Sequence, residues 1–198
     1  MWNRNKAEMI LHLIRHGKTL ANEQKLYYGF TDISVSQQGL QELAILKKDI
    51  TYPVADLHIV SGLMRTVQTA NILFDSPSLE IITDLREMNF GDFEMRSYEE
   101  LKSVPAYQDW ISNIAKAAPP RGERQDTFLK RITRGLLEIE HLCKSKSASS
   151  AVIITHGGVI ATIMALYFPG HKNFYQWQPE FGRGYTLHLD ANKNYTDI

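Results

Sequence analysis

Two histidines and two arginines follow short apolar runs of this sequence, namely Arg15, His16, Arg65 and His156. A guanidinium group forms paired hydrogen bonds with phosphate oxygens, and it keeps its charge at every physiological pH. An unprotonated imidazole is a nucleophile that can carry a covalent intermediate. Together these residue types indicate a site that holds a phosphate group and attacks it through a histidine.

The apolar runs before these residues predict the strands that must position them. Short β-branched runs alternate with longer segments whose apolar residues recur at helical spacing. Such alternation favours an α/β fold, here a three-layer α/β/α sandwich in which a mostly parallel sheet has helices on both faces. Ligands of such sheets bind beyond the carboxyl ends of the strands, where the four residues would meet. The predicted strands are 9–14, 57–60, 79–82, 151–154 and 185–189, and the predicted helices are 36–49, 63–74, 124–144 and 158–167.

Residues 88–123 interrupt this alternation. They contain short helical pieces and no convincing strand, which predicts a helical insertion that lies over the site as a lid. The length of 198 residues suits one domain spanning 1–198 with this insertion.

An acid is also needed if a phosphate ester is to be cleaved, because the leaving oxygen must take up a proton. After the predicted strand 79–82 the sequence offers Asp84 and Glu87. In the mechanism that we favour, His16 attacks phosphorus while both arginines and a protonated His156 surround its oxygens. Glu87 then protonates the leaving oxygen and later takes a proton from water, with Asp84 as the first alternative.

Four motifs resemble those of the histidine phosphatase superfamily, also called the phosphoglycerate mutase-like superfamily, and the resemblance covers nearly the whole chain. It implies that His16 is the phosphorylated nucleophile, that Arg15, Arg65 and His156 form the phosphate pocket and that Glu87 is the proton donor. It further implies phosphate contacts from Asn22 and Gly157. Lys18 departs from the acidic or glutamine residue common at its position, and its charge would add positive potential at the rim. The motifs are Leu13-Ile14-Arg15-His16-Gly17-Lys18-Thr19, Ser61-Gly62-Leu63-Met64-Arg65-Thr66, Leu85-Arg86-Glu87 and Thr155-His156-Gly157-Gly158.

The segment that follows Glu87 favours a phosphatase over a phosphoglycerate mutase. It is acidic on balance and offers one arginine, Arg96, which is a poor setting for a bisphosphoglycerate. The stretch 87–96 most resembles the alpha-ribazole-5'-phosphate phosphatases of cobalamin nucleotide-loop assembly. The alternatives are a broad-specificity small-molecule phosphatase, a mutase and, from another class, a non-catalytic module that binds phosphorylated ligands. Aromatic rings that could stack on a flat leaving group are Tyr28, Phe90, Phe93, Tyr107 and Trp110.

The composition excludes several other classes of protein. The formal net charge is zero at pH 7, so no basic excess points to nucleic acid or to a membrane surface. A single cysteine, Cys143, rules out an intramolecular disulfide and a cysteine metal cluster. We expect no cofactor and no metal, because arginines supply the positive charge. No apolar run suits a signal peptide or a membrane span, so we expect a cytoplasmic protein whose partner is a small phosphomonoester. The sequence allows a homodimer without indicating one.

Overall fold

A six-stranded sheet forms the centre of the molecule, in the strand order β4-β3-β6-β1-β7-β8. The structure is a computed structural model, and it describes residues 9–189 and 194–198. Strands β4, β3, β6 and β1 are parallel to one another. On the other side of β1, β7 pairs antiparallel with β1, and β8 pairs antiparallel with β7. The strands are β1 (Ile10–Arg15), β3 (Leu57–Val60), β4 (Leu79–Ile81), β6 (Ser150–Thr155), β7 (Gly184–His188) and β8 (Asn194–Asp197).

The register of the two central strands decides where the site lies. β1 and β6 are parallel, and Arg15 is aligned with Thr155 at their carboxyl ends. Both strands are almost entirely buried, as expected for parallel strands that are covered on both faces. Consequently His16 and His156, which follow these strands directly, leave the same edge of the sheet side by side.

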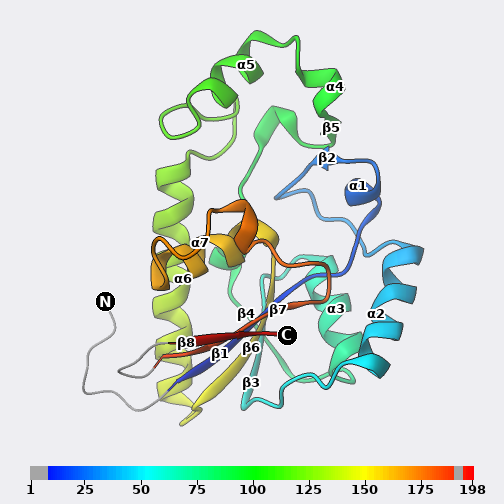
Figure 1. Cartoon of the computed structure of the whole chain (residues 1–198), viewed down its shortest axis with the longest axis vertical. Helices are drawn as coiled ribbons and strands as arrows, with labels where there is room; N and C mark the ends of the chain where they lie inside the picture. Colours follow the sequence, from blue (N-terminus) through cyan, green and yellow to red (C-terminus); the bar gives the residue numbers. More distant parts are fainter. Residues whose placement is uncertain (1–8, 190–193) are drawn as a thin grey trace.

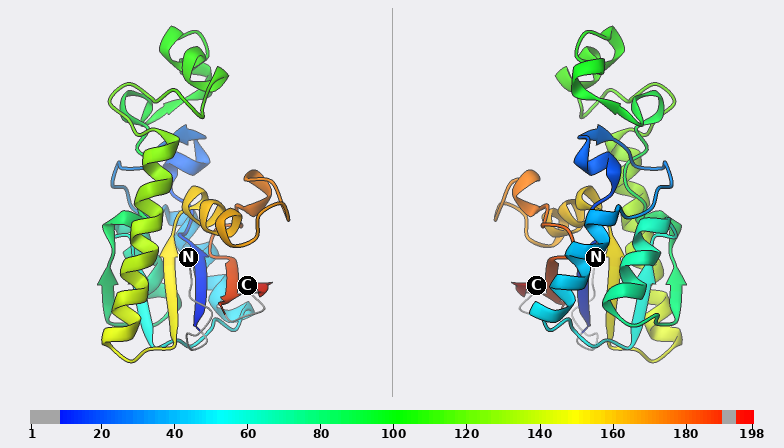
Figure 2. Two further views of the ribbon diagram at one scale, coloured as in Figure 1. Left: turned by 90° about the vertical axis from the view of Figure 1, so that its left-hand side faces the viewer. Right: turned by 90° about the vertical axis from the view of Figure 1, so that its right-hand side faces the viewer.

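Helices cover both faces of the sheet (Figures 1 and 2). Leu43 of α2 and Ala70 of α3 pack on one face with Ile14 and Val60. The opposite face is covered by α6 and α7. Short helices α1 and η3 and the turn η1 lie in the connections. Their bounds are α1 (Leu20–Glu23), α2 (Gln37–Asp49), α3 (Met64–Leu73), η1 (Thr83–Leu85), α6 (Gln125–Ser145), α7 (Gly157–Tyr167) and η3 (Tyr175–Trp177).

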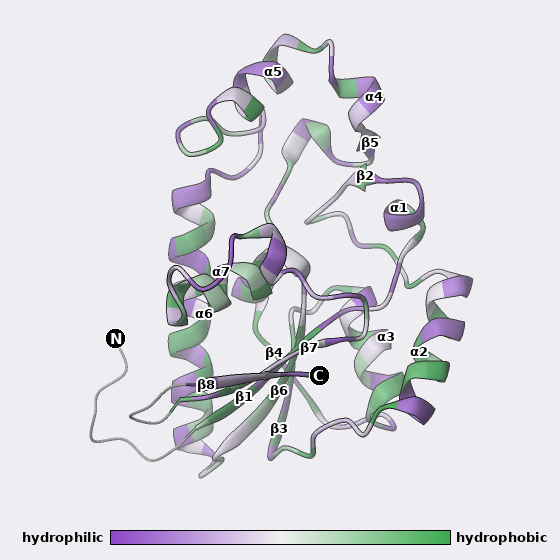
Figure 3. Ribbon diagram, in the orientation of Figure 1, coloured by the Kyte–Doolittle hydropathy of each residue, from purple (hydrophilic) through white to green (hydrophobic). Residues whose placement is uncertain are grey.

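The apolar pattern explains these positions. Burying one Leu, Ile or Phe side chain stabilises the fold by roughly 1.5–3 kcal/mol, and α6 buries Phe128, Ile132 and Ile139 along one stripe. Figure 3 shows α7 as mostly hydrophobic, whereas α2 and α6 alternate between hydrophobic and hydrophilic turns. Ser36 caps α2, because its hydroxyl accepts a hydrogen bond from the Gly39 N–H at 3.0 Å.

The insertion forms a separate layer beyond the carboxyl edge of the sheet (Figure 1). It has its own small core of Phe93, Leu101, Tyr107 and Trp110. A two-stranded antiparallel sheet joins it to the first loop of the chain, because β5 pairs with β2. Its elements are η2 (Gly91–Phe93), β5 (Arg96–Ser97), α4 (Tyr98–Leu101) and α5 (Pro105–Ser112), and β2 comprises Leu26–Tyr27.

All five predicted strands and all four predicted helices are present, with bounds that differ by at most one residue at each end. The prediction that 88–123 contains no strand was wrong, since β5 lies within it. Two residues are too few to show a period, and β5 exists only because β2, about seventy positions earlier, pairs with it. The sequence analysis also passed over α1 and β8. In the part of the chain that the structure describes, no helix has the length and apolar character to cross a membrane.

Candidate active site

His16 directly follows β1, and a backbone carbonyl fixes the tautomer of its ring. Its Nδ1 lies 2.7 Å from the Gly17 carbonyl oxygen, and because that oxygen only accepts hydrogen bonds, Nδ1 carries the proton. Nε2 is therefore unprotonated, and its lone pair is available to a ligand. Burial lowers the pKa of His16 well below its usual value, and the charges of Arg65 and Arg15 lower it further. The ring is 4% exposed, so the imidazolium form is disfavoured in the free protein.

Arg65 is buried and Arg15 half-buried beside His16, and neither has an acidic partner among the residues that the structure describes. None of the ion pairs among residues 9–189 and 194–198 includes either guanidinium group. Backbone carbonyls and aromatic rings hold them instead. Arg15 donates to the Pro179 oxygen at 2.8 Å and lies 4.0 Å from the centre of the Phe181 ring.

Arg65 lies in the first turn of α3, where the sequence analysis placed it. Its Nη1 donates to the Thr31 oxygen at 2.9 Å and its Nη2 to the Gly29 oxygen at 2.7 Å. Burial lowers the pKa of both arginines, and the carboxyl group of Glu87 raises it again. Two cations that are largely shielded from solvent and lack a carboxylate ligand are suited to a bound anion.

His156 is the N-cap residue of α7 and faces His16, with 5.1 Å between the ring centres. Its Nε2 lies 2.9 Å from the Ser61 hydroxyl, and its Nδ1 is buried without a hydrogen-bond partner. Burial lowers the pKa of His156 well below its usual value, and the Arg65 charge adds to this. The protonated His156 of the favoured mechanism concerns the site with phosphate bound, and it stays a prediction. A phosphate dianion beside Nδ1 would favour the protonated form again.

Glu87 follows η1 and lies against the N-terminus of α7. Its carboxyl oxygens accept hydrogen bonds from the N–H groups of Met88 at 2.9 Å and Gly158 at 2.8 Å. A Cβ atom at Gly158 would lie 2.4 Å from Glu87 Oε1, so only glycine leaves room for the carboxyl group. Burial raises the pKa of Glu87 above its usual value, which keeps the proton on the acid at higher pH. The sequence analysis assigned Gly158 no role.

Asn22 also lines the site. Its Oδ1 accepts hydrogen bonds from Thr19 N–H at 3.0 Å and Tyr28 OH at 2.7 Å, which leaves its amide NH₂ group as the donor for a ligand. Gly157 is the first residue of α7, and its Cα approaches the Arg15 side chain so closely that a Cβ would lie 3.3 Å from Arg15 Cζ. Both residues thus lie where the sequence predicted phosphate contacts.

Two other candidates lie apart from these groups. The Asp84 carboxylate is bound by Arg134, with 2.7 Å between Asp84 Oδ1 and Arg134 Nη2, and it does not line the cavity. Lys18 pairs with Glu42 at 2.7 Å and borders a neighbouring hollow rather than the site itself. Its predicted positive potential at the rim is thus compensated by a carboxylate.

A cavity of about 930 Å³ extends from this site under the insertion. We call its inner end, formed by Arg15, His16, Arg65, Glu87 and His156, the phosphate pocket. We call the remainder the outer chamber. It is lined by Phe90 and Trp110 of the lid and by Phe174 and Tyr175, which the sequence analysis missed. Tyr28 also lines the cavity, but it lies at the phosphate pocket, with 4.7 Å between its ring centre and Arg65 Cζ. Phe93 and Tyr107 are buried within the lid and do not reach the cavity.

Comparisons with known proteins agree with this geometry. The sequence matches the Histidine phosphatase superfamily (branch 1) over residues 11–193, and the chain belongs to this superfamily. It is similar to the adenosylcobalamin/alpha-ribazole phosphatase of Escherichia coli (strain K12), with 29% identity over 194 residues that cover 96% of this chain and 94% of that protein.

Solved structures are similar over almost the whole chain. The alpha-ribazole phosphatase from Shigella flexneri is 26% identical with a TM-score of 0.82, and the match covers 96% of both chains. A phosphoglycerate mutase from Thermus thermophilus is 28% identical with a TM-score of 0.71, covering 95% of this chain and 96% of that one. The predicted superfamily, α/β fold class and phosphatase class are confirmed.

Proposed function

We propose that this protein hydrolyses phosphomonoesters through a phosphohistidine on His16, and that its substrate is alpha-ribazole-5'-phosphate. One observation carries the proposal. Arg15 Nε, Arg65 Nε and His156 Nδ1 are buried nitrogens without a hydrogen-bond partner in the described part of the chain, and all three belong to the phosphate pocket. Unpartnered buried polar groups are costly, and phosphate oxygens would satisfy them.

The first step transfers the phosphoryl group to the protein. His16 Nε2 attacks phosphorus and forms the N–P bond while the bond to the ester oxygen breaks. The electron pair stays on that oxygen, which takes the proton of Glu87. Arg15, Arg65, Asn22, His156 and the N-terminus of α7 at Gly157 hold the remaining oxygens as their charge is redistributed.

The second step reverses the roles. The Glu87 carboxylate takes a proton from water, and the water oxygen attacks phosphorus while the N–P bond breaks. The electron pair returns to His16 Nε2, phosphate leaves, and Glu87 is again protonated. Because buried arginines supply the positive charge, we expect turnover to be independent of Mg²⁺ and unaffected by EDTA.

The residues that line the outer chamber support the proposal that the leaving group is uncharged and flat. Beyond the phosphate pocket its one charged lining residue among those described is Asp126, which already pairs with Arg124 at 2.9 Å. A leaving group that carries a carboxylate, such as glycerate, would find no cation there. Stacking of a base on an aromatic ring is worth roughly 1–3 kcal/mol in other proteins, and Phe90, Trp110 and Phe174 offer such rings. Relatives are named alpha-ribazole phosphatases, which agrees with a benzimidazole-like leaving group.

The covalent step is tested by trapping. Wild-type protein mixed with a ³²P-labelled phosphomonoester and quenched in alkali should retain label, because phosphohistidine is stable there and labile in acid. His16→Ala should retain none and lose at least about 10⁴-fold in kcat/KM. His141→Ala, which changes an exposed histidine of α6, is the matched control and should behave as wild type. Equal negligible hydrolysis by wild type and His16→Ala, with binding of the ligand by both, would indicate a non-catalytic module.

The substrate is tested by comparing kcat/KM for alpha-ribazole-5'-phosphate, 3-phosphoglycerate and 4-nitrophenyl phosphate, each with and without EDTA. We expect the first to be preferred by at least about tenfold, the size of one stacking contact. Similar values for all three would favour a broad-specificity phosphatase, and isomerisation of 3-phosphoglycerate a mutase. The single catalytic domain spanning 1–198, the cytoplasmic location, the homodimer and the lack of nucleic-acid binding stay predictions.

A further inference from the structure

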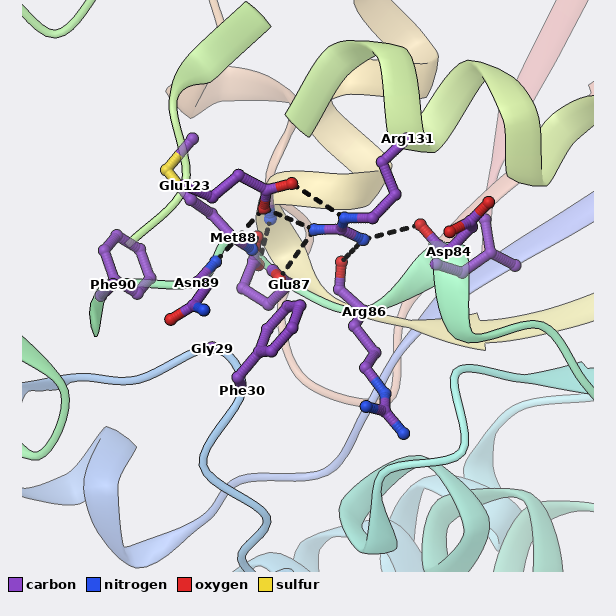
Figure 4. A network of polar contacts seen from close by, with 12 residues as sticks. Gly29, Phe30, Asp84, Arg86, Glu87, Met88, Asn89, Phe90, Glu123 and Arg131 are labelled. Atoms are coloured by element: carbon purple, nitrogen blue, oxygen red, sulfur yellow. Dashed lines mark hydrogen bonds and ion pairs between the residues drawn. The ribbon is translucent and has the colours of Figure 1, made fainter. Parts of the chain in front are cut away.

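Arg131, on the second turn of α6, lies outside the phosphate pocket but contacts the segment that carries Glu87. Its Nη1 donates to the carbonyl oxygens of Asp84 at 2.7 Å and Arg86 at 2.9 Å, and its Nη2 donates to the Glu87 oxygen at 3.1 Å. Figure 4 shows the guanidinium group between α6 and this segment. Three carbonyl groups within four residues are therefore fixed by one side chain.

The same guanidinium group is bound by the carboxylate of Glu123. Arg131 Nε donates to Glu123 Oε1 at 2.9 Å, and Nη2 donates to Oε2 at 2.7 Å. Both side chains are nearly buried, with 11% exposure for Arg131 and 9% for Glu123. A lysine has a single nitrogen and no planar fork, so it could not bridge the carboxylate and three carbonyls together.

Glu123 in turn joins the two chain segments that enter and leave the lid. Its N–H donates to the Asn89 oxygen at 2.8 Å, and its Oε2 accepts from the Asn89 N–H at 3.3 Å. Arg131, Glu123 and Asn89 thus form one continuous network at the base of the lid (Figure 4). The acid Glu87 lies two residues before Asn89, on the segment that enters the lid.

We propose that Arg131 is a positioning residue for proton transfer: through Glu123 and the carbonyls of 84, 86 and 87 it fixes the Glu87 carboxyl group and the base of the lid as one unit. Arg131 is not among the residues that line the cavity, so it acts on the reaction through Glu87. Breaking these contacts of Arg131 loosens the segment that aims Glu87 and leaves the four basic residues of the phosphate pocket in place. This inference rests on the proposed phosphatase function.

Two substrates of similar shape measure this effect. Departure of phenolate from phenyl phosphate needs a proton from Glu87, whereas departure of 4-nitrophenolate needs little help. The ratio kcat/KM is used because it reports the step in which the leaving group departs. For Arg131→Lys we expect a loss of about 10–100-fold with phenyl phosphate, within the range that proton transfer contributes, and less than about threefold with 4-nitrophenyl phosphate.

Arg134→Lys is the matched control. Arg134 lies on the same helix and pairs with the Asp84 side chain, but it is 68% exposed. We expect less than about a twofold change with either substrate, because exposed ion pairs contribute little. A second readout is the pH profile of kcat/KM with phenyl phosphate. Loosening the segment should lower the raised pKa of Glu87, so the basic limb of the profile should move to lower pH in Arg131→Lys. Burial sets the raised pKa of Glu87, and its charged neighbours are Arg15 from β1 and Arg65 from α3.

Equal losses of kcat/KM with the two substrates, or an unmoved basic limb, would overturn the inference and give Arg131 a structural role only. If Arg131→Lys does not fold, Glu123→Gln takes its place, since it leaves the three carbonyl contacts and weakens the base of the lid. A smaller loss confined to phenyl phosphate is then expected, and an equal loss with both substrates contradicts the inference. Failure of the wild type to hydrolyse either ester would instead refute the proposed function.

Discussion

The phosphate pocket and the outer chamber differ in where their residues come from and in how firmly these are held. Arg15, His16 and His156 leave adjacent central strands of the sheet, and each is fixed by buried hydrogen bonds. The outer chamber is lined by a separate lid with its own small core and by a loop that carries Phe174 and Tyr175, which are 39% and 75% exposed. The pocket is therefore rigid and polar, and the chamber is apolar and partly open.

From this difference we expect the pocket to determine the reaction and the outer chamber to determine which leaving groups are accepted. In the proposed mechanism the basic residues of the pocket contact only the phosphoryl group, which all phosphomonoesters share, so damage to them should affect every substrate alike. The chamber contacts only the leaving group, so damage there should affect one substrate and spare another. Glu87 belongs to the pocket, but in the proposed mechanism it protonates the bridging oxygen, so its effects should depend on the leaving group's need for a proton.

The largest effect is expected from Arg65→Gln. Removing one buried charged donor to a phosphoryl group costs about 10³-fold in kcat/KM, and the loss should be the same for alpha-ribazole-5'-phosphate and methyl phosphate. Arg121→Gln is the control, since Arg121 is an arginine of the lid whose side chain is 84% exposed. A loss that differs more than about tenfold between the two esters, one decade in kcat/KM, would break the division between pocket and chamber.

Glu87→Gln should give the next largest effect. We expect a loss of about 10²-fold or more in kcat/KM for phenyl phosphate, as proton donation contributes, and a much smaller loss for 4-nitrophenyl phosphate. Glutamine keeps an oxygen that can accept from Gly158 N–H, so the pocket should keep its shape. Equal losses would place the proton donor elsewhere, although Asp84 is already occupied by Arg134.

The pH dependence follows from the raised pKa of Glu87. The acid is active when protonated, so its contribution is complete below this pKa and is lost as the pH rises through it. For phenyl phosphate, wild-type kcat/KM should therefore fall by about tenfold for each pH unit on the basic side. Glu87→Gln should lack this limb, and 4-nitrophenyl phosphate should show little of it. A limb that persists in the variant would belong to another group.

The smallest effect is expected in the outer chamber. Phe174→Ala should raise KM for alpha-ribazole-5'-phosphate by about 5–10-fold, the lower end of a stacking contribution because the ring is partly exposed. Methyl phosphate, which does not reach the chamber, should be unaffected. Tyr98→Ala changes an exposed aromatic ring of the lid that does not line the cavity, and it serves as the control. A similar rise in KM for both esters would show that the loop supports the pocket as well.

Much of the fold and of the candidate site could be predicted from the sequence. Short apolar, β-branched runs and segments of helical period are local patterns, so the five strands and four helices were predicted. Residues that follow parallel strands must meet at one edge, so Arg15, His16 and His156 were placed together. The residue types indicated the chemistry, because arginine side chains bind phosphate oxygens and an unprotonated imidazole can attack phosphorus.

Only the tertiary structure decided which of these groups carry a proton and which residues surround them. Burial among distant segments lowers the pKa of His156 and raises the pKa of Glu87. The local sequence around these two residues does not show how deeply their side chains are buried. Several contacts of the site also join residues that are far apart in the chain. They are the pairing of β2 with β5, the place of Phe174 in the cavity lining, and the hydrogen bonds of Arg131 to Asp84 and Glu123. The sequence alone determines the residue types and their local order. Contacts between distant segments form only when the chain packs, and they determine the pKa values of the site residues, the orientation of Glu87 and the shape of the outer chamber.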